Sequence, residues 1–135
     1  MRKLVVVLAL AALSACTPSE IAMWHEWRAV DPVAADAYAD DVIARAEHGR
    51  CADWRDDALG VGWSVDDWPT LNRVMWAESM CLPDAYNRSG ASGLLQIMPM
   101  WRDDCGGGDL FDPTFNLACG LHVLHVQGWQ AWSTY

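Results

Sequence analysis

The sequence predicts a small, mainly α-helical domain with one short loop or β-hairpin beside its central helix. Three observations support this prediction. The chain has 135 residues and is 53% apolar, which is enough for one hydrophobic core but not for two domains. Prolines and capping residues open several segments of helical period, and glycines follow their ends. The glycine-rich segment 87–93 cannot continue a helix, so it predicts a tight turn or hairpin.

The first segment, MRKLVVVLALAALSAC, has the parts of an export signal. A basic start is followed by an apolar run from Leu4 to Leu13, then by small residues and Cys16. The run is shorter than the roughly 20 residues that span a membrane, so residues 1–15 are expected to be removed. The ending LSAC resembles the bacterial lipoprotein cleavage motif. This resemblance implies a lipid anchor at Cys16, on the periplasmic or extracellular face of the cell envelope; a secreted protein with a free thiol is the alternative.

The charge of the chain argues against nucleic acid as a partner. The formal net charge is −9, and removal of residues 1–15 would make it −11 because Arg2 and Lys3 would be lost. The remaining arginines are scattered among aspartates and glutamates, whereas phosphate contacts need clustered basic residues. The sequence leaves the oligomeric state open.

The cysteines predict a disulfide framework. Four of them follow Cys16, and an even count in an exported chain indicates two disulfides, each worth roughly 2–4 kcal/mol. Of the three possible connectivities, proximity along the chain favours Cys51–Cys81 and Cys105–Cys119. No CxxC spacing is present, and no third ligand is spaced with His122 and His125, so we expect neither a metal site nor a cofactor.

Residues 16–50 are expected to form a membrane-proximal tether with N-terminal helices, ahead of a domain over residues 51–135. The first helix is predicted within residues 19–30. The second opens with Asp31 as N-cap and Pro32 at its first position, and its alanine-rich body stops before a glycine.

The domain begins with a polar, broken region over residues 51–62, which predicts a loop. Ser64 or Asp67 then caps a helix that runs to about Met80. The last helix follows an Asp-Pro pair, covers about residues 113–127 and stops at a glycine.

One glutamate, Glu78, lies on the apolar side of the helix that ends near Met80. At about 100° per residue, it falls in the middle of an arc of apolar side chains. The members of this arc are Leu71, Val74, Met75 and Leu82. An ionised carboxylate on an apolar surface is costly, so such a residue is usually paired, protonated or used in chemistry. Burial among these side chains and near Trp76 would raise the pKa of Glu78 above its ordinary value of about 4.3 and leave a general acid.

Three motifs follow one another along the chain. They are Glu78-Ser79, the segment GASGLLQ over residues 90–96, and Asp112-Pro113 with Asn116 and Gly120. In this order and spacing they resemble the SLT type of lytic transglycosylases in the lysozyme superfamily, over roughly residues 68–126. The resemblance implies a lysozyme-like α+β fold and cleavage of peptidoglycan between N-acetylmuramic acid and N-acetylglucosamine.

The same resemblance implies a role for Glu78 as both acid and base. It would protonate the glycosidic oxygen, then take the proton of the muramyl 6-hydroxyl, which closes a 1,6-anhydro ring. Met98 stands where related goose-type lysozymes have an aspartate, although Asp84, Asp103 or Asp104 could supply the second carboxylate of a muramidase that hydrolyses the same bond. A lipoprotein that only binds glycan is the other alternative. The predicted substrate-binding residues are Ser79, Tyr86, Gly93, Gln96 and Asn116.

The C-terminal end departs from the family pattern. SLT-type enzymes usually carry an Ala-Tyr-Asn-x-Gly motif whose tyrosine lies beside the catalytic glutamate, whereas this chain ends GWQAWSTY. The sequence assigns that role neither to Trp129 nor to Tyr135. Trp101 is a further candidate for stacking on a sugar, although most of the nine tryptophans are expected in the core.

Overall fold

The computed structural model describes residues 18–133, with the exception of the Glu20 side chain. The predicted export signal over residues 1–15, the predicted lipidation of Cys16 and the last two residues lie outside this range. The chain divides into two compact units, and the division follows residue 47. None of the helices within the described range is long and apolar enough to span a membrane.

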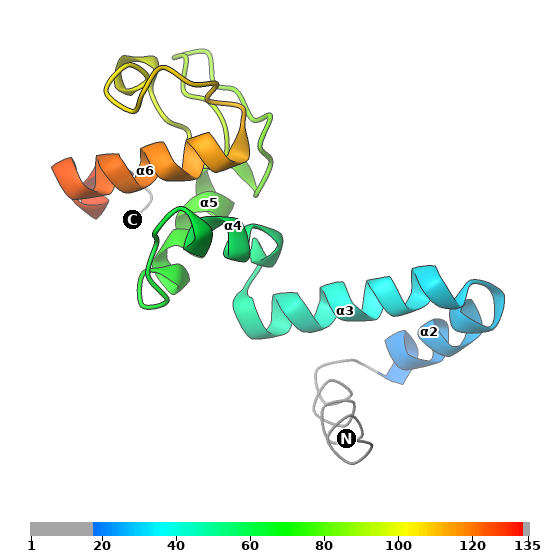
Figure 1. Ribbon diagram of the computed structural model, residues 1–135. Helices are drawn as coiled ribbons and strands as arrows, with labels where there is room; N and C mark the ends of the chain where they lie inside the picture. The colour runs from blue at the N-terminus through cyan, green and yellow to red at the C-terminus, as the bar shows by residue number, and fades with distance from the viewer. Residues whose placement is uncertain (1–17, 134–135) are drawn as a thin grey trace. The chain divides into compact units, whose positions relative to one another are not determined.

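The N-terminal unit consists of two helices, α2 (Pro18–Val30) and α3 (Pro32–His48), which confirms both predicted helices (Figure 1). Asp31 caps α3 as expected, because its carboxylate accepts a hydrogen bond from the Ala34 N–H at 3.0 Å. The indole N–H of Trp24 donates to the carbonyl of Ala35 at 2.9 Å and thereby ties α2 to α3.

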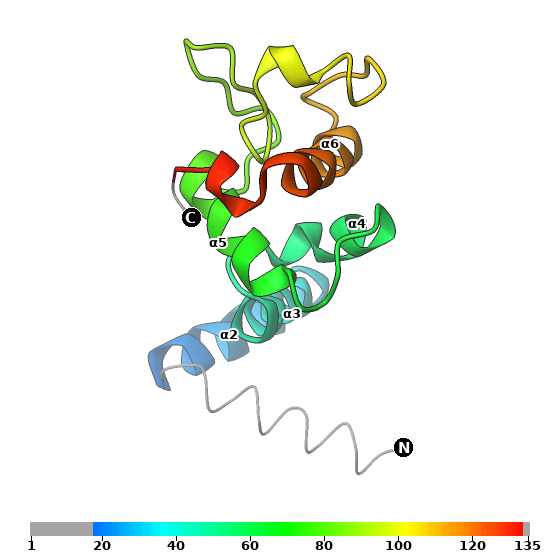
Figure 2. The ribbon, with the colours of Figure 1, turned by 90° about the vertical axis from the view of Figure 1, so that its left-hand side faces the viewer.

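The C-terminal unit is also mainly helical, as predicted. Its elements are η1 (Ala52–Trp54), α4 (Arg55–Gly60), α5 (Trp68–Ser79), η2 (Pro99–Trp101), α6 (Pro113–Gln127) and η3 (Trp129–Ala131). Figures 1 and 2 show α6 between the long loops that follow α5 and the short helix α4. The hairpin expected near segment 87–93 is reduced to isolated antiparallel bridges, Tyr86 with Ser92 and Ser92 with Ile97.

The prediction of a loop over residues 51–62 is wrong, because η1 and α4 lie there. Ala58 is fully buried, and Trp54 and Val61 pack against the core beside it. These three residues follow the spacing i, i+4, i+7, so one side of an otherwise acidic segment is apolar. Burial of that narrow apolar side stabilises the helix. The polar composition of the segment had instead indicated a loop.

The central helix α5 follows Asp67, whose N–H donates to the Ser64 hydroxyl at 3.0 Å. The helix ends at Ser79 because Met80 and Cys81 adopt left-handed backbone conformations, with φ of 52° and 64°. Leu82 therefore lies beyond the helix and is half exposed, so its expected place on the apolar arc is wrong.

Tryptophans supply much of the core, in line with the expectation from the sequence. Trp63, Trp68 and Trp132 are buried, and Trp54, Trp101 and Trp129 pack against the core. A buried indole N–H needs a partner. The N–H groups of Trp63, Trp68 and Trp132 donate to the carbonyls of Leu117, His48 and Leu95, at 2.9, 2.7 and 2.8 Å.

Both predicted disulfides are present. Cys51–Cys81 joins the start of the C-terminal unit to the end of α5, and Cys105–Cys119 ties the glycine-rich loop to α6. Each is expected to stabilise the unit by roughly 2–4 kcal/mol, chiefly through restriction of the unfolded chain. The first bond anchors the turn at Met80 and Cys81, directly after Glu78 and Ser79.

Candidate active site

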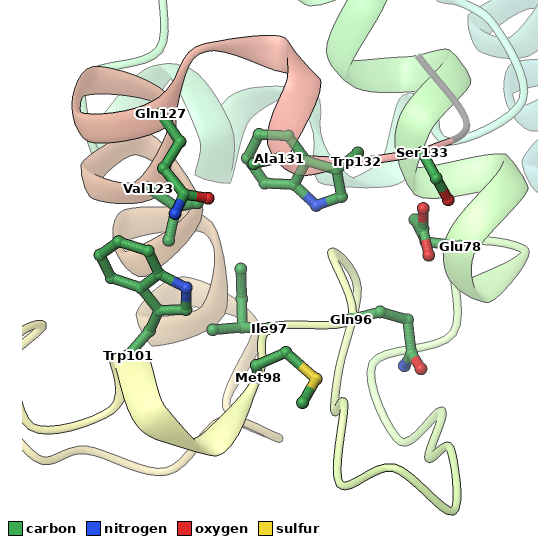
Figure 3. A pocket seen from close by; sticks show the side chains of 10 residues that line it. All are labelled: Glu78, Gln96, Ile97, Met98, Trp101, Val123, Gln127, Ala131, Trp132 and Ser133. Carbon is green, nitrogen blue, oxygen red and sulfur yellow. The ribbon is translucent and has the colours of Figure 1, made fainter.

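A cleft with a volume of about 150 Å³ opens at the C-terminal end of α5. Four segments far apart in the sequence form it: the end of α5, the segment around η2, the second half of α6 and the C-terminal residues. Its lining consists of Glu78, Gln96, Ile97, Met98, Trp101, Val123, Gln127, Ala131, Trp132 and Ser133. Figure 3 shows Glu78 and Ser133 toward one end of this cleft, and Trp101 and Gln127 toward the other.

Glu78 is half-buried and lines the cleft, so the expectation of a glutamate enclosed by apolar side chains is only partly correct. Leu71 and Met75 are fully buried beneath it, as expected. Trp76, however, is 37% exposed, because two residues place it about 200° around the helix from Glu78. Glu78 therefore stands at the edge of the core, where its carboxylate can reach a ligand in the cleft.

The backbone beside this glutamate has an unusual conformation. Within residues 18–133, the non-glycine residues with positive φ are Met80, Cys81 and Gln96, the last at 49°. Met80 and Cys81 lie two and three residues after Glu78, and Gln96 lines the cleft. Left-handed conformations cost energy for residues with side chains and cluster at functional sites. Their position supports this cleft as the functional site.

Gln96, a predicted substrate-binding residue, lines the cleft but is engaged with the protein. Its amide nitrogen donates to the carbonyls of Ala85 and Gly93, both at 3.0 Å. Because both partners are carbonyl oxygens, the amide NH₂ group must face them. A sugar hydroxyl in the cleft could therefore meet only the amide oxygen of Gln96.

Asn116 and Gly93, both predicted as substrate-binding residues, are buried in the core behind the cleft and lie outside its lining. Asn116 is fully buried; its amide donates to the carbonyls of Ser92 and Leu110 at 2.9 and 2.8 Å, and its oxygen accepts from the Leu95 N–H at 2.9 Å. A Cβ atom at Gly93 would collide with the Asn116 side chain and the Leu110 carbonyl. The glycine thus permits close packing of backbone on asparagine, rather than on glycan.

Ser79 also lies behind the cleft, since its side chain is buried. Its hydroxyl donates to the Leu94 carbonyl at 2.8 Å and lies 3.0 Å from the Met75 carbonyl. This residue joins the end of α5 to the segment that carries Gln96. A direct contact with substrate, as predicted, would require that these bonds break.

Tyr86 is 65% exposed and lies outside the lining of the cleft. Its ring packs against Phe111, with 6.4 Å between ring centroids. The structure therefore does not bring Tyr86 together with Glu78. Trp101, in contrast, lines the cleft as the sequence suggested, and its ring makes an edge contact with His122.

The C-terminal segment supplies cleft residues that sequence reasoning missed, above all Trp132. Its indole N–H reaches the carbonyl of Leu95, 37 residues away, and its ring packs on Trp129, which packs on Trp63. This stack brings Ala131 and Ser133 to the cleft. The three-residue spacing of the two C-terminal tryptophans was the only signal; Tyr135 lies outside the described residues.

Replacement of Trp132 by phenylalanine tests this anchor. The ring would still fill most of its site, but the buried Leu95 carbonyl would lose its donor, which typically costs about 1–3 kcal/mol. We expect a lower free energy of unfolding in urea. The matched control is Trp27→Phe on α2, where the ring is 39% exposed and little change is expected. An unchanged stability for Trp132→Phe would contradict the anchoring role.

The aspartates considered for a second carboxylate lie away from the cleft. Asp84, Asp103 and Asp104 are exposed and none belongs to its lining, whereas Met98 does. The residues from 18 to 133 contain no group of three or more His, Cys, Asp or Glu side chains placed to hold a metal ion.

Comparison with known families agrees with this site. Residues 64–130 match the family described as the transglycosylase SLT domain, a range that includes α5, Gln96, α6 and Trp129. No curated protein and no solved structure gives a significant match. The match supports an assignment of this domain to the lytic transglycosylase family, whose members act on peptidoglycan glycan strands.

Proposed function

From the match to the lytic transglycosylase family, we propose that this protein cleaves the β-1,4 bond between N-acetylmuramic acid and N-acetylglucosamine and forms 1,6-anhydromuramic acid. The observation that carries the proposal is the shared cleft of Glu78, Gln96 and Met98. It combines one carboxyl group with an amide and a thioether.

The reaction assigns two successive tasks to Glu78. Its carboxylic acid donates a proton to the glycosidic oxygen as the bond to the muramyl C1 breaks, and the N-acetylglucosamine end leaves with a hydroxyl. The carboxylate so formed accepts the proton of the muramyl 6-hydroxyl, whose oxygen bonds to C1. The proton is thereby restored, and no water is consumed. Half-burial at the cleft edge gives Glu78 access to both oxygens in turn.

Met98 favours this intramolecular closure over hydrolysis. Inverting and retaining hydrolases generally use a second carboxylate, either to activate water or to form a covalent intermediate. The thioether of Met98 lines the cleft at the sequence position where goose-type lysozymes carry an aspartate, and a thioether can do neither. The substrate's acetamido group would instead support the developing positive charge at C1.

We also propose that the protein is exported and held at the cell envelope by a lipid on Cys16. The motif LSAC at the end of a signal-like segment supports this proposal. Incorporation of labelled palmitate into the wild-type protein, but not into Cys16→Ser, would test it.

The products of cleavage test the proposed function directly. Purified peptidoglycan would be incubated with the full-length protein in detergent, and the released muropeptides analysed by mass spectrometry. Products 18 Da lighter than those of a muramidase, which correspond to the loss of one water, are expected. Reducing ends instead would establish a hydrolase. No products from a protein shown to be folded with both disulfides would leave only glycan binding.

A further inference from the structure

A second cavity lies on the other side of the central helix. It has a volume of about 270 Å³ and is lined by Gly49, Arg50, Asn72, Arg73 and Trp76. The guanidinium carbon of Arg50 lies 4.5 Å from the centroid of the Trp76 ring. The Trp76 ring, the Arg50 guanidinium stacked on it and the second arginine, Arg73, therefore line one cavity of the C-terminal unit.

This cavity faces away from the cleft. At 3.6 residues per turn, Trp76 and Arg73 lie about 200° and 140° around α5 from Glu78, so they share the opposite side of the helix. Trp76 is 37% exposed although it is a large aromatic residue, and both arginines are exposed. The active-site chemistry proposed above uses none of these side chains.

The charge of the cavity is unusual for an acidic chain. The net charge is −9, yet two of the few arginines converge here. Arg73 donates to the Thr70 hydroxyl at 3.4 Å, and the ion pairs of Arg28, Arg45 and Arg55 lie outside the cavity. A guanidinium stacked on an indole keeps its N–H edge available, and that edge matches a carboxylate in bidentate geometry.

We propose that this cavity binds the peptide that substitutes a peptidoglycan strand, through a carboxylate held by Arg50 and Arg73 and an apolar side chain packed on Trp76. The proposal rests on the proposed function, because that function brings such strands to α5. Muramic acid carries these short peptides, and their free carboxylates complement the two arginines. Strand and peptide would then contact opposite sides of one helix.

The dimensions favour the stem peptide of a neighbouring strand. A helix with its side chains is about 10–12 Å across, so half of its circumference is about 16–19 Å, whereas four extended residues reach about 14 Å. A stem peptide on the strand bound in the cleft therefore falls short of the cavity, and one on a neighbouring strand in the wall can occupy it. The cavity would select peptide-substituted glycan over bare glycan.

The test is a titration of the full-length protein in detergent with a synthetic four-residue stem peptide that has free carboxylates. Binding would be followed through the indole N–H resonance of Trp76, assigned with the Trp76→Phe variant. We expect this resonance to shift, and Arg50→Met and Arg73→Met each to raise Kd about fivefold, the scale of an exposed charge-assisted contact. Arg88→Met, an exposed arginine outside the cavity, is the matched control and should leave Kd unchanged.

Two further arms separate the alternatives. The same peptide with amidated carboxylates should not shift the Trp76 resonance. If it binds equally well, or if the free peptide produces no shift, the proposal is overturned. Displacement of the peptide by an equal concentration of inorganic phosphate would also overturn it, in favour of a phosphate site. Peptide binding can be measured without cleavage. If the protein binds the peptide but releases no muropeptides, the proposed peptide site is supported and the proposed enzymatic function is refuted.

Discussion

Replacement of Glu78 by glutamine is expected to lower the rate of peptidoglycan cleavage by about 10³-fold or more, since general acid–base groups typically contribute 10²–10⁴-fold and Glu78 would serve as both acid and base. Glutamine has nearly the same shape but cannot donate and recover a proton. The initial rate of release of anhydro-muropeptides measures the effect. Retention of more than a tenth of the wild-type rate would contradict the assignment.

Two controls separate chemistry from folding in this experiment. Asp84→Asn removes an exposed carboxylate that lies outside the cleft, so its cleavage rate should equal that of wild type. Glu78→Gln should still sediment with insoluble peptidoglycan, because the cleft surface is retained. Glu78→Asp moves the carboxyl group back by about one methylene, and a misplacement of about 1 Å can cost 10²-fold. Its rate should therefore be far below that of wild type.

The helices could be predicted wherever the sequence marks their first turn. Asp31 before Pro32 and Asp112 before Pro113 both act as N-caps, because a side-chain oxygen accepts a backbone N–H at 3.0 or 2.7 Å. These signals are local, since each cap and its partner are three residues apart. Helix α4 lacks such a signal, because no side chain caps it. Its narrow apolar side can be recognised only once the packing of the core is known.

The motifs located the site but did not distinguish reacting residues from supporting ones. Glu78 and Gln96 line the cleft, whereas Ser79, Gly93 and Asn116 hold the two segments that carry them. Three of the supporting contacts join residues 15 to 24 positions apart: Ser79 with Leu94, Asn116 with Leu95, and Asn116 with Ser92. Spacing along a chain does not reveal such partners. For the same reason the sequence missed Trp132, whose partner is 37 residues away.

The geometry of the cleft therefore depends on Asn116, a fully buried residue outside the cleft lining. Asn116 in the first turn of α6 is hydrogen-bonded to three backbone groups, from residues 92, 95 and 110. Gln96 follows directly after one of them and adopts its left-handed conformation there. The buried hydrogen bonds of Asn116 thus position the Gln96 side chain at the cleft. The stability of the unit and the geometry of its cleft depend on the same contacts.

Replacement of Asn116 by alanine is expected to lower the free energy of unfolding by about 3–5 kcal/mol, because two carbonyls and one N–H would lose buried partners. This is a large part of the 5–15 kcal/mol typical of a domain. Asn116→Asp should be at least as harmful, since a carboxylate would face two carbonyl oxygens. Urea unfolding with both disulfides intact measures the change, and exposed Thr114→Ala on the same helix should change stability by less than about 0.5 kcal/mol.

The same variants decide between support and substrate binding for Asn116. If it only supports the site, activity should fall in parallel with stability, and lower temperature or a stabilising salt should recover part of both. A ligand role predicts a different pattern: full stability, lost cleavage and no recovery. The complete burial of Asn116 favours the first pattern, and so do its three hydrogen bonds, because both N–H groups of its amide donate to backbone carbonyls.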